Sequence, residues 1–504
     1  MASRAAFRRG WSLQAILAFL LVALVASSCT SGERGRPTGE AGTGGDAAAL
    51  PPCPLEALDE AVARNGGKPV EVVIWHFLQA KTRESLERLV NEYNASQTRV
   101  RVRAENQGSS NDELWDKYRA GIRTKALPGI AILDDTVTRQ IVDSGTVLPA
   151  QSCIDADHYD MSDFLPTAKS YYTIDGAIYP ASLNLSGALL YYNKNHFRRA
   201  GLDAESAPRT LAEVRQFAER IKAAGVVDKP VVLQLSPALL EMFLTGSQVS
   251  MVDNDNGRGP GKTTQAVFAN DPKTVELFEW IKEMIDAGLL DALPQTSGQI
   301  GHYLAMANQK SSMTIETSTA ATSVEAFLKG DLRTGEIGGR EIDASGIDLS
   351  ALDIGAAPVP GQFEPGRLAM GGGAWYITNT TPPEVQAAAW DFIKFFNRTE
   401  SQVQWNIEGS YLPYRMSAIR DPQLEDRWRN TLSGRWLAMA YDELINGIDP
   451  SFPGPLIGPY DQFRQALREA VDGLIFERTP PEEALQKAQS KATAAIKQYN
   501  DENF

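Results

Sequence analysis

Residues 70–77 read VEVVIWHF, and this stretch opens the run of segments that decides the fold. Its β-branched and aromatic residues are typical of a strand. The apolar residues between positions 86 and 93 then recur at helical spacing. The sequence therefore predicts a strand over 70–77 that is followed directly by a helix.

The same alternation continues along the chain. Residues 100–103 (VRVR) predict a second strand, and residues 111–125 predict a capped helix. Residues 129–133 (GIAIL) predict a buried strand that ends at Asp134 and Asp135. A β-α-β-α-β series forms a parallel or mixed sheet covered by helices. Ligand sites in such sheets lie off the carboxyl ends of strands, which is where these two carboxylates fall.

Later segments keep this α/β pattern. The sequence predicts strands over 189–192 and 231–235, helices over 211–223, 272–287 and 383–396, and a final helix that begins near Thr479-Pro480-Pro481-Glu482.

The composition is that of a folded soluble protein, with 43% hydrophobic, 8% aromatic and 22% charged residues. A chain of 504 residues holds enough material for two or three domains. The formal net charge is -14, and so acidic a surface repels nucleic-acid backbones and anionic lipid headgroups. We therefore expect a mostly globular protein with no nucleic-acid partner.

The N-terminus has the order of a secretory signal. Three arginines in residues 4–9 precede an apolar run over 13–25, which is shorter than the ~20 residues that span a bilayer. The small residues before Cys29 resemble a bacterial lipobox, with Ala26 where leucine is usual. We expect cleavage before Cys29, a lipid on its thiol, and a flexible tether over 30–50. The alternatives are an ordinary signal peptide or an uncleaved anchor.

Two cysteines, Cys53 and Cys153, remain if Cys29 carries lipid. An even number of thiols in an oxidising compartment is consistent with a disulfide. Two separate buried thiols are the alternative, because the sequence does not fix the distance between their Cα atoms.

Signatures of catalysis and cofactor binding are incomplete. Residues 256–263 (NGRGPGKT) lack the first glycine of a phosphate-binding loop, and Pro260 removes a backbone donor. We interpret this stretch as a glycine-rich surface turn. The acidic residues at 253 and 255 do not keep the spacing of a calcium loop, and four scattered histidines imply no metal site. No G-x-S-x-G motif is present, so we expect no metal, no cofactor and no catalytic residue.

Landmarks spread along the chain resemble those of a known family. They are Ile74-Trp75-His76, LLYYNK over 189–194 followed by Ala200-Gly201-Leu202, GGGAW over 371–375, GSYLP over 409–413, and GPYDQFR over 458–464. From residue 70 to its end the chain resembles an extracellular solute-binding protein of an ABC importer. Within the carbohydrate-binding class, it is most similar to the subgroup that binds glycerol-3-phosphate and glycerophosphodiesters.

The resemblance implies a two-lobe α/β fold of the periplasmic-binding-protein type, with a ligand cleft between the lobes and crossing hinge segments. The expected domains are the signal peptide 1–28, the tether 29–66, lobe 1 over 67–185, lobe 2 over 186–316, a return to lobe 1 over 317–374, and a return to lobe 2 with the C-terminal helices over 375–504.

Carried over by position, the ligand contacts of the family fall on Asp135, Ser186, Thr317 or Ser318, Gly372, Tyr411 and Arg464. Asp135 can accept hydrogen bonds from two hydroxyls, and Arg464 offers a planar donor fork for phosphate or paired hydroxyls. Each residue also has a structural alternative. In these alternatives Asp135 caps the following helix, Gly372 allows a bulge, and Tyr411 packs in the core. Arg464 would then form an ion pair with an acidic residue.

Two aromatic residues of the glycerophosphate subgroup are absent, a tyrosine near Asn106 and a tryptophan near Pro237. The missing tryptophan removes a stacking or cation-π partner. These departures favour a different glycerophosphodiester or an oligosaccharide as the ligand.

The function we expect is that of a monomeric, lipid-anchored binding protein on the extracellular face of the cell membrane. It would capture a glycerophosphodiester, glycerol-3-phosphate or a sugar and deliver it to the transmembrane permease subunits, without turnover. The alternative is a secreted, lipid-anchored glycoside or phosphodiester hydrolase that uses Asp135 with Glu316.

Overall fold

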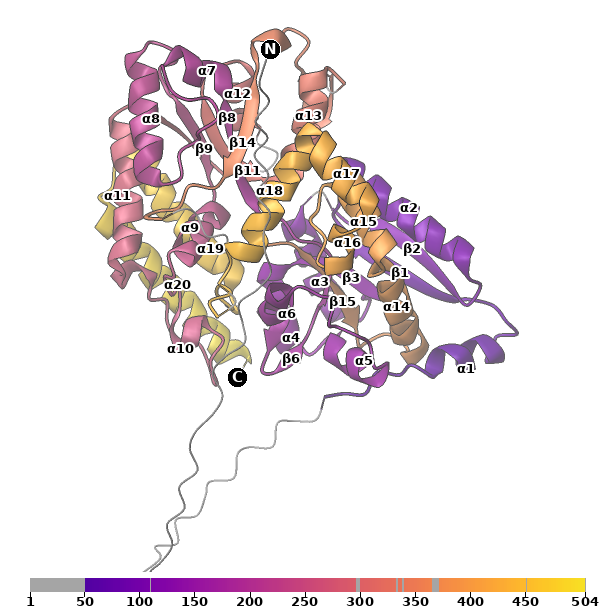
Figure 1. The fold of residues 1–504 in the computed structure, drawn as a ribbon. Coiled ribbons are helices and arrows are strands. Elements are labelled where there is room, and N and C mark those ends of the chain that lie inside the picture. Colours follow the sequence, from indigo (N-terminus) through magenta and orange to yellow (C-terminus); the bar gives the residue numbers. More distant parts are fainter. Residues whose placement is uncertain are drawn as a thin grey trace, which may run out of the picture. The chain divides into compact units, whose positions relative to one another are not determined.

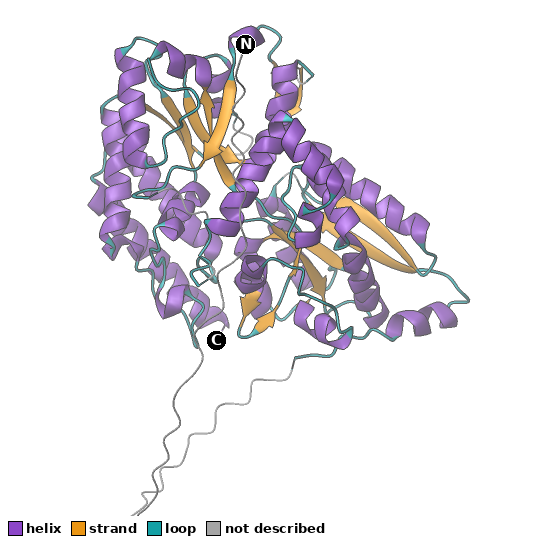
Figure 2. Cartoon of the chain, viewed as in Figure 1, coloured by secondary structure: helices purple, strands orange, loops and turns teal. Residues whose placement is uncertain are grey.

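Two β-sheets, each covered by helices, organise the protein in the computed structural model (Figures 1 and 2). The structure describes residues 50–108, 110–295, 300–331, 334–337, 340–364, 371–449 and 451–503. The predicted signal peptide, Cys29 and most of the predicted tether lie outside these residues.

The first sheet has the strand order β2-β1-β3-β15-β4, with β7 paired to β15. Strands β1, β2 and β3 run parallel, whereas β15 runs antiparallel to β3 with Gly373 opposite Asp134. The bounds are β1 Val70–His76, β2 Val100–Asn106, β3 Ile130–Asp134, β4 Val147–Leu148, β7 Ala181–Ser182 and β15 Gly373–Thr378.

Helices from both ends of the sequence cover this first sheet. The core on one face joins β1 and α2 to α14 and to Trp405 of α15. The strand over 70–77 and the helix over 383–396 are thus confirmed. The helices of this lobe are α1 Ala57–Arg64, α2 Ala80–Ser96, α3 Asn111–Thr124, α4 Thr138–Asp143, α5 Ala150–Ala156, α6 Pro166–Tyr172, α14 Pro383–Phe396 and α15 Thr399–Gly409, with a small hairpin of β5 Thr173–Ile174 and β6 Ala177–Ile178.

The second sheet has the order β10-β9-β11-β8-β14. Strands β9, β10 and β11 are parallel, and β8 is antiparallel to both of its neighbours. The strands are β8 Ala188–Asn193, β9 Val231–Leu235, β10 Leu290–Pro294, β11 Met313–Thr317 and β14 Ile354–Pro358. A separate hairpin pairs β12 Thr334–Ile337 with β13 Arg340–Asp343.

Helices surround the second sheet, and all of them except α10 and α12 contribute buried residues to one large core with its strands. They are α7 Lys194–Arg199, α8 Leu211–Ala223, α9 Pro237–Gly246, the four-residue turn α10 Asp253–Asn256, α11 Pro272–Asp286, α12 Gly301–Ala307, α13 Ala321–Lys329, α18 Leu432–Asn446, α19 Tyr460–Asp472 and α20 Pro481–Asn503. Two further helices, α16 Met416–Ile419 and α17 Pro422–Asn430, lie between α15 and α18 along the chain.

The chain crosses between the lobes after β7, after β14 and after α15. The crossing segments pair with one another: Leu185 and Leu412 exchange backbone hydrogen bonds of 3.3 and 2.8 Å, and the Ser186 N-H donates to the Gly371 carbonyl over 3.0 Å. The predicted two-lobe α/β fold with crossing segments is confirmed.

The predicted domain boundaries are wrong in the second half. Strand β14 at 354–358 belongs to the second sheet, on the free side of β8, so the segment 317–374 is not a return to lobe 1. Strand β15 and helix α14 belong to the first lobe, so the segment 375–504 starts there. A short apolar strand fits the edge of either sheet, and only long-range pairing decides between them.

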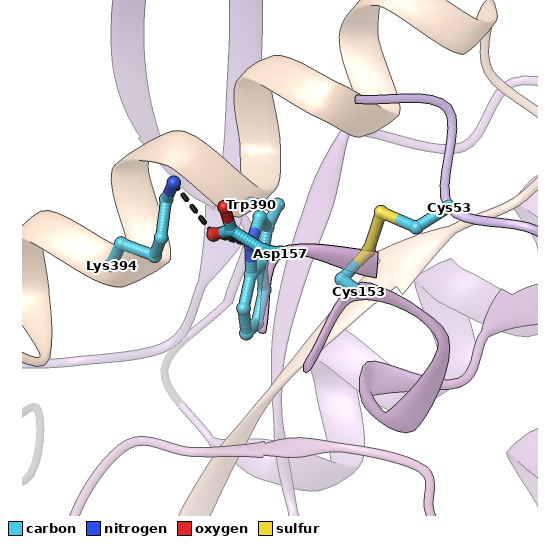
Figure 3. Close-up of a disulfide and its surroundings, with 5 residues drawn as sticks. All are labelled: Cys53, Cys153, Asp157, Trp390 and Lys394. Atoms are coloured by element: carbon cyan, nitrogen blue, oxygen red, sulfur yellow. Dashed lines mark hydrogen bonds and ion pairs between the residues drawn. A yellow bond between two sulfur atoms is a disulfide. The ribbon is translucent and has the colours of Figure 1, made fainter. Parts of the chain in front are cut away.

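The predicted tether over 29–66 is too long. Helix α1 packs on α14, and Leu58 and Ala61 belong to the core of the first lobe. A disulfide joins Cys53 to Cys153 of α5, with the Cα atoms 4.9 Å apart (Figure 3). Beside it, Asp157 accepts hydrogen bonds from the Trp390 indole (2.9 Å) and the Lys394 ammonium (2.7 Å) of α14. Folded structure therefore begins before residue 57.

Within the described ranges, none of the helices is long and apolar enough to cross a membrane. The same residues contain no cluster of three or more histidine, cysteine or acidic side chains that could hold a metal ion.

Candidate ligand-binding site

Asp135 lies at the carboxyl end of β3, at the edge where the first lobe meets the crossing segments. The Asp134 carboxylate accepts from the Thr136 N-H (3.2 Å) and hydroxyl (2.7 Å) and so holds the 3-10 turn Asp135–Val137. The Asp135 backbone N-H donates to the Gly372 carbonyl over 3.1 Å. Its carboxylate is buried and accepts a hydrogen bond from the Tyr171 hydroxyl of α6. Asp134, not Asp135, is thus the capping residue.

The electrostatics of Asp135 are those of a buried acid. Burial raises its pKa well above the ordinary value, and the nearby Asp134 carboxylate adds to this effect. The hydrogen bond from Tyr171 and the positive charge of Arg464 act in the opposite direction. Asp135 therefore binds a proton more readily than an exposed aspartate does.

Gly372 is required by its backbone neighbours. Its φ is +153°, and a Cβ atom at this position would overlap the backbone oxygen of Asn184. The adjacent Gly373 N-H donates to the Asn184 side-chain oxygen over 2.6 Å. Gly372 thus lets two crossing segments approach closely and places the carbonyl that holds Asp135.

The predicted serine and threonine contacts lie at the crossing as well, where they bond backbone groups. The Ser318 N-H donates to the Gly187 carbonyl (2.7 Å), and the buried Ser318 hydroxyl accepts from the Gly187 N-H (3.3 Å). The Ser186 hydroxyl donates to the Gly371 carbonyl at 3.5 Å. Thr317 accepts from the Thr319 N-H at 3.4 Å. The structure therefore places Ser186 at Gly371, next to Gly372, and Ser318 at Gly187, next to Ser186.

Tyr411 follows α15 on the third crossing segment. Its ring stacks on Trp405 with centroids 5.7 Å apart and planes inclined by 6°. Burial raises the pKa of Tyr411 to about 12, with a smaller contribution from Asp134. Tyr411 therefore belongs partly to the core and lies within electrostatic range of the acidic pair after β3.

Arg464 of α19 has an ion-pair partner. Its Nη2 lies 2.6 Å from Oε2 of Glu241 on α9, and its Nε donates to Oε1 of Glu241 over 3.0 Å. The guanidinium also lies 5.1 Å from the Tyr460 ring centroid. Arg464 thus pairs with an acidic residue, which was the structural alternative for this position.

Sequence reasoning missed Tyr171 and the role of Arg258. Arg258 lies in the glycine-rich turn of the second lobe, and its Nη1 donates to the Tyr171 carbonyl of the first lobe over 3.1 Å. Its Nε donates to the Gly454 carbonyl over 2.7 Å, and its guanidinium lies 5.3 Å from the Tyr171 ring centroid. The charges of Arg258 and Asp135 interact. The sequence offered only one indication of this role, an arginine inside a glycine-rich stretch, and such a pattern is weak evidence for a binding residue.

Glu316, the proposed hydrolase partner of Asp135, has its own contacts. Its Oε2 lies 2.8 Å from Nε2 of the buried His302, and its Oε1 accepts from the Thr317 N-H over 2.6 Å. Asp135 is held instead by Tyr171, in the other lobe. Asp135 and Glu316 therefore have different hydrogen-bond partners, and these contacts do not join them as a catalytic pair.

Asn106 and Pro237, at the positions where the glycerophosphate subgroup has aromatic residues, have structural roles in this protein. The Asn106 side chain donates to the Leu78 carbonyl (3.0 Å) and accepts from the Gly108 N-H (3.1 Å). Pro237 is the first residue of α9, which Ser236 caps. The same helix carries Glu241, the partner of Arg464.

A second contact between the lobes lies near the C-terminus. The Tyr499 hydroxyl of α20 donates to Asp143 of α4 over 2.7 Å, and Asp143 also pairs with Arg139 at 2.7 Å. A cavity of about 260 Å³ lies between α3 and α4 of one lobe and α19 and α20 of the other, with Trp115 and Gln462 in its lining. The lobes therefore meet both at Arg258 and at Tyr499.

The chain is similar in sequence to known bacterial binding proteins. The sn-glycerol-3-phosphate-binding periplasmic protein UgpB of Rhizobium meliloti (strain 1021) is 25% identical over 436 residues, which cover 84% of this chain and 94% of that protein. Its counterpart in Escherichia coli O6:K15:H31 is 21% identical over 451 residues, covering 88% and 96%.

Solved structures share the fold. UgpB from Mycobacterium tuberculosis in complex with glycerophosphocholine superimposes with a TM-score of 0.68 at 15% identity, covering 85% of this chain and 99% of that one. The cyclic alpha-maltosyl-1,6-maltose binding protein from Arthrobacter globiformis gives a TM-score of 0.64 at 22% identity, covering 85% and 100%.

Residues 88–431, more than half of the chain, match the family described as bacterial extracellular solute-binding protein. This match agrees with the landmarks in the sequence and with the two-lobe fold. The chain belongs to the bacterial extracellular solute-binding protein family.

Proposed function

We propose that this protein is the solute-binding component of an ABC importer and captures glycerol-3-phosphate, a glycerophosphodiester or a sugar between its lobes. The observation that carries the proposal is the cluster where the lobes meet. It combines Asp135 of the first lobe with Arg258 of the second, which both hydrogen-bond to Tyr171, and with Arg464, whose charge interacts with that of Asp135. The names of the UgpB relatives and of the sugar-binding structural neighbours support the choice of solutes.

The side chains of the cluster suit a polyol that carries polar or charged groups. A buried carboxyl such as Asp135 hydrogen-bonds hydroxyls, and guanidinium groups donate to phosphate oxygens or paired hydroxyls. The partly buried Tyr411 ring, which packs on the fully buried Trp405, offers an apolar face for a carbon skeleton. Each of these groups recognises a solute without any bond being made or broken.

Capture requires the lobes to separate and close again. In the structure, Arg258 contacts Tyr171 and Tyr499 contacts Asp143 across the junction. Both contacts break when the lobes open, and a solute held by both lobes favours the closed state. A closed form of this kind is the one that we propose the permease recognises.

Thermal-shift and calorimetric titration of the purified full-length protein tests the proposal. The panel contains glycerol-3-phosphate, glycerophosphocholine, glycerol and a series of mono- and oligosaccharides. A ligand at about 100 times its Kd adds about 2.7 kcal/mol to the free energy of unfolding, so a true solute gives a clear shift. Recovery of the solute unchanged supports a binding protein. A released product, or no response to any compound, contradicts the proposal.

We also propose that Cys29, which lies outside the described residues, carries the lipid that holds the protein on the extracellular face of the membrane. The arginine-rich start, the apolar run and the small residues before Cys29 support this. Cys29→Ala is expected to release the protein into the medium and to abolish labelling with palmitate. Labelling that persists in Cys29→Ala contradicts the assignment. A single monomer mass in light scattering tests the expected monomeric state.

A further inference from the structure

The two arginines of the cluster differ in what balances their charge. Arg464 forms the short ion pair with Glu241, which is 6% exposed. Arg258 donates to two neutral carbonyls, Gly454 and Tyr171. Among the residues that the structure describes, no carboxylate oxygen lies within 4.0 Å of an Arg258 nitrogen. The positive charge without an ion-pair partner is therefore that of Arg258.

Arg258 is only partly exposed, so water solvates this charge incompletely. Burial lowers the pKa of its guanidinium, and the negative charges of Asp135 and Asp255 only partly offset this effect. A guanidinium has five N-H donors, and the two carbonyls take one each. Donors therefore remain for a ligand, and an anion would gain most from them because the site is partly dehydrated.

The turn that carries Arg258 is built at a conformational cost. Asn254, Asp255 and Asn256 have φ values of 55°, 53° and 55°, and Gly257 follows with 80°. Consecutive left-handed residues are unfavourable for L-amino acids, so side chains must hold the turn. Asn256 accepts from the Met251 N-H over 2.9 Å, and Asn254 donates to the Gly259 carbonyl over 3.0 Å.

The consequence of this turn is the position of Arg258. The Arg258 N-H donates to the Asp255 carbonyl over 3.0 Å, which ties its backbone to the left-handed run. Its guanidinium then reaches the first lobe and stacks beside Tyr171, whose hydroxyl donates to Asp135. A strained segment that directs one charged side chain into a site is a common feature of functional positions.

We infer that Arg258 is the specificity-determining residue that recognises an anionic group of the solute, and that this solute is a phosphate-bearing polyol. The inference rests on the proposed function, because it takes the cluster as the binding site. Arg464, neutralised by Glu241, then serves to position neighbouring groups. The phosphate recognised is a monoester or a diester, and both offer the same oxygen atoms to the guanidinium.

Calorimetry on three full-length variants tests the inference. Arg258→Gln removes the charge, Arg258→Lys keeps it, and Arg220→Gln is the matched control. Arg220 is an exposed arginine of the same lobe that also donates to a backbone carbonyl, that of Gly201, over 2.9 Å. Each variant is titrated with glycerol-3-phosphate, glycerophosphocholine and glycerol, at low and high salt.

We expect Arg258→Gln to weaken binding of the phosphate-bearing solute by more than about tenfold, as the loss of a charge-assisted contact predicts. Arg258→Lys should recover part of that loss and Arg220→Gln should bind as the wild type does. The wild-type affinity should also fall with salt, and this dependence should weaken in Arg258→Gln. A merely structural role for Arg258 would change affinity without changing the salt dependence. The monoester and diester arms identify which phosphate is bound.

Other outcomes overturn the inference. If the wild type binds a phosphate solute and Arg258→Gln binds it within threefold, the inference is wrong and the proposed function stands. The same holds if the wild type binds only neutral sugars. If the wild type binds no compound in the panel, the proposed function fails, and the inference fails with it.

Discussion

The two lobes present their charged side chains to the same place by different means. In the first lobe, Asp135 lies directly after the regular strand β3, where Asp134 caps a short turn. In the second lobe, Arg258 follows a left-handed turn whose backbone is held by asparagine side chains. Both side chains contact Tyr171.

This difference between a regular strand and a left-handed turn determines which of the two side chains can be predicted from the sequence. Sheet topology places ligand sites at the carboxyl ends of strands. A strand that can be recognised in the sequence therefore also locates the residues at that end. A side chain positioned by a strained turn depends on contacts particular to this chain. The predictions below test whether each lobe depends on the features described.

The largest effect is expected from removal of the disulfide that closes the first lobe. The double substitution Cys53→Ser/Cys153→Ser opens a loop with a sequence separation of 100 residues. Chain-entropy arguments assign about 4.7 kcal/mol to a loop of that length. Chemical denaturation should show a loss approaching this value, while solute affinity is unchanged because neither cysteine contacts Asp135. Reduction of the wild type is the control, and a large change in affinity would contradict this view of the first lobe.

The next effect is expected in the turn of the second lobe. Gly257→Ala places a Cβ atom against the Leu456 carbonyl at a φ of +80°, and the combined strain should cost about 3 kcal/mol. Gly261→Ala is the matched control, because Gly261 has a φ of +97° but open space around its Cα. Equal losses of the free energy of unfolding in the two variants would show that the Leu456 contact does not hold the turn.

A smaller effect is expected from Glu241→Gln, which leaves Arg464 without its anion. The free energy of unfolding should fall by about 2 kcal/mol, less than for a fully buried pair, because the Arg464 side chain is 29% exposed. Binding of a phosphate solute should become tighter, since a second arginine is then available. Weaker binding of that solute in Glu241→Gln would show that Glu241 itself holds the ligand.

The smallest change in stability is expected from Asp135→Asn. Because the folded pKa of Asp135 is raised above its ordinary value of 3.8, the folded state binds the proton more tightly than the unfolded chain. Stability from this group is complete below pH 3.8 and declines as the pH rises toward the folded pKa. Asp135→Asn should therefore raise the Tm at pH 7 by a degree or two, given about 2–4 °C per kcal/mol in mid-sized domains. It should also weaken solute binding about tenfold.

Asp160→Asn provides the control of opposite sign. The Asp160 carboxylate accepts from the Ser162 N-H over 2.8 Å, and its pKa is lowered chiefly by that bond. Its contribution is present above its ordinary pKa and is lost as the pH falls. Removal of this carboxylate should lower the Tm at pH 7 and leave solute affinity unchanged. A Tm decrease at pH 7 in Asp135→Asn as well would contradict the raised pKa of Asp135.

Much of the fold followed from the sequence because strong local patterns specify it. The helices over 211–223 and 383–396 and the strand over 231–235 agree with α8, α14 and β9 to the residue. The sheet to which residues 354–358 belong did not follow from the sequence. A short apolar strand carries no signal for its pairing partner, and this is why the domain boundaries after residue 317 were wrong.

The candidate site divides in the same way. Asp135 was expected both from strand topology and from the family landmarks, and the structure places Gly372 beside it. Ser186 is bonded to the neighbouring Gly371, whereas Ser318 is bonded to Gly187. The ion pair of Arg464 with Glu241 was only one alternative, because residues 223 positions apart meet through tertiary packing alone. Arg258 was placed in a surface turn, since four left-handed residues in succession have no reliable sequence signature.

The central claim is that a solute binds between the lobes, between Asp135 and Arg258. A crystal structure of the full-length protein with the tightest-binding compound of the panel tests this claim most directly. We predict that solute oxygen atoms lie within hydrogen-bond distance of both side chains, with hydroxyls at Asp135 and an anionic group at Arg258. A solute bound elsewhere, with the contacts of Asp135, Tyr171 and Arg258 unchanged, would contradict the claim.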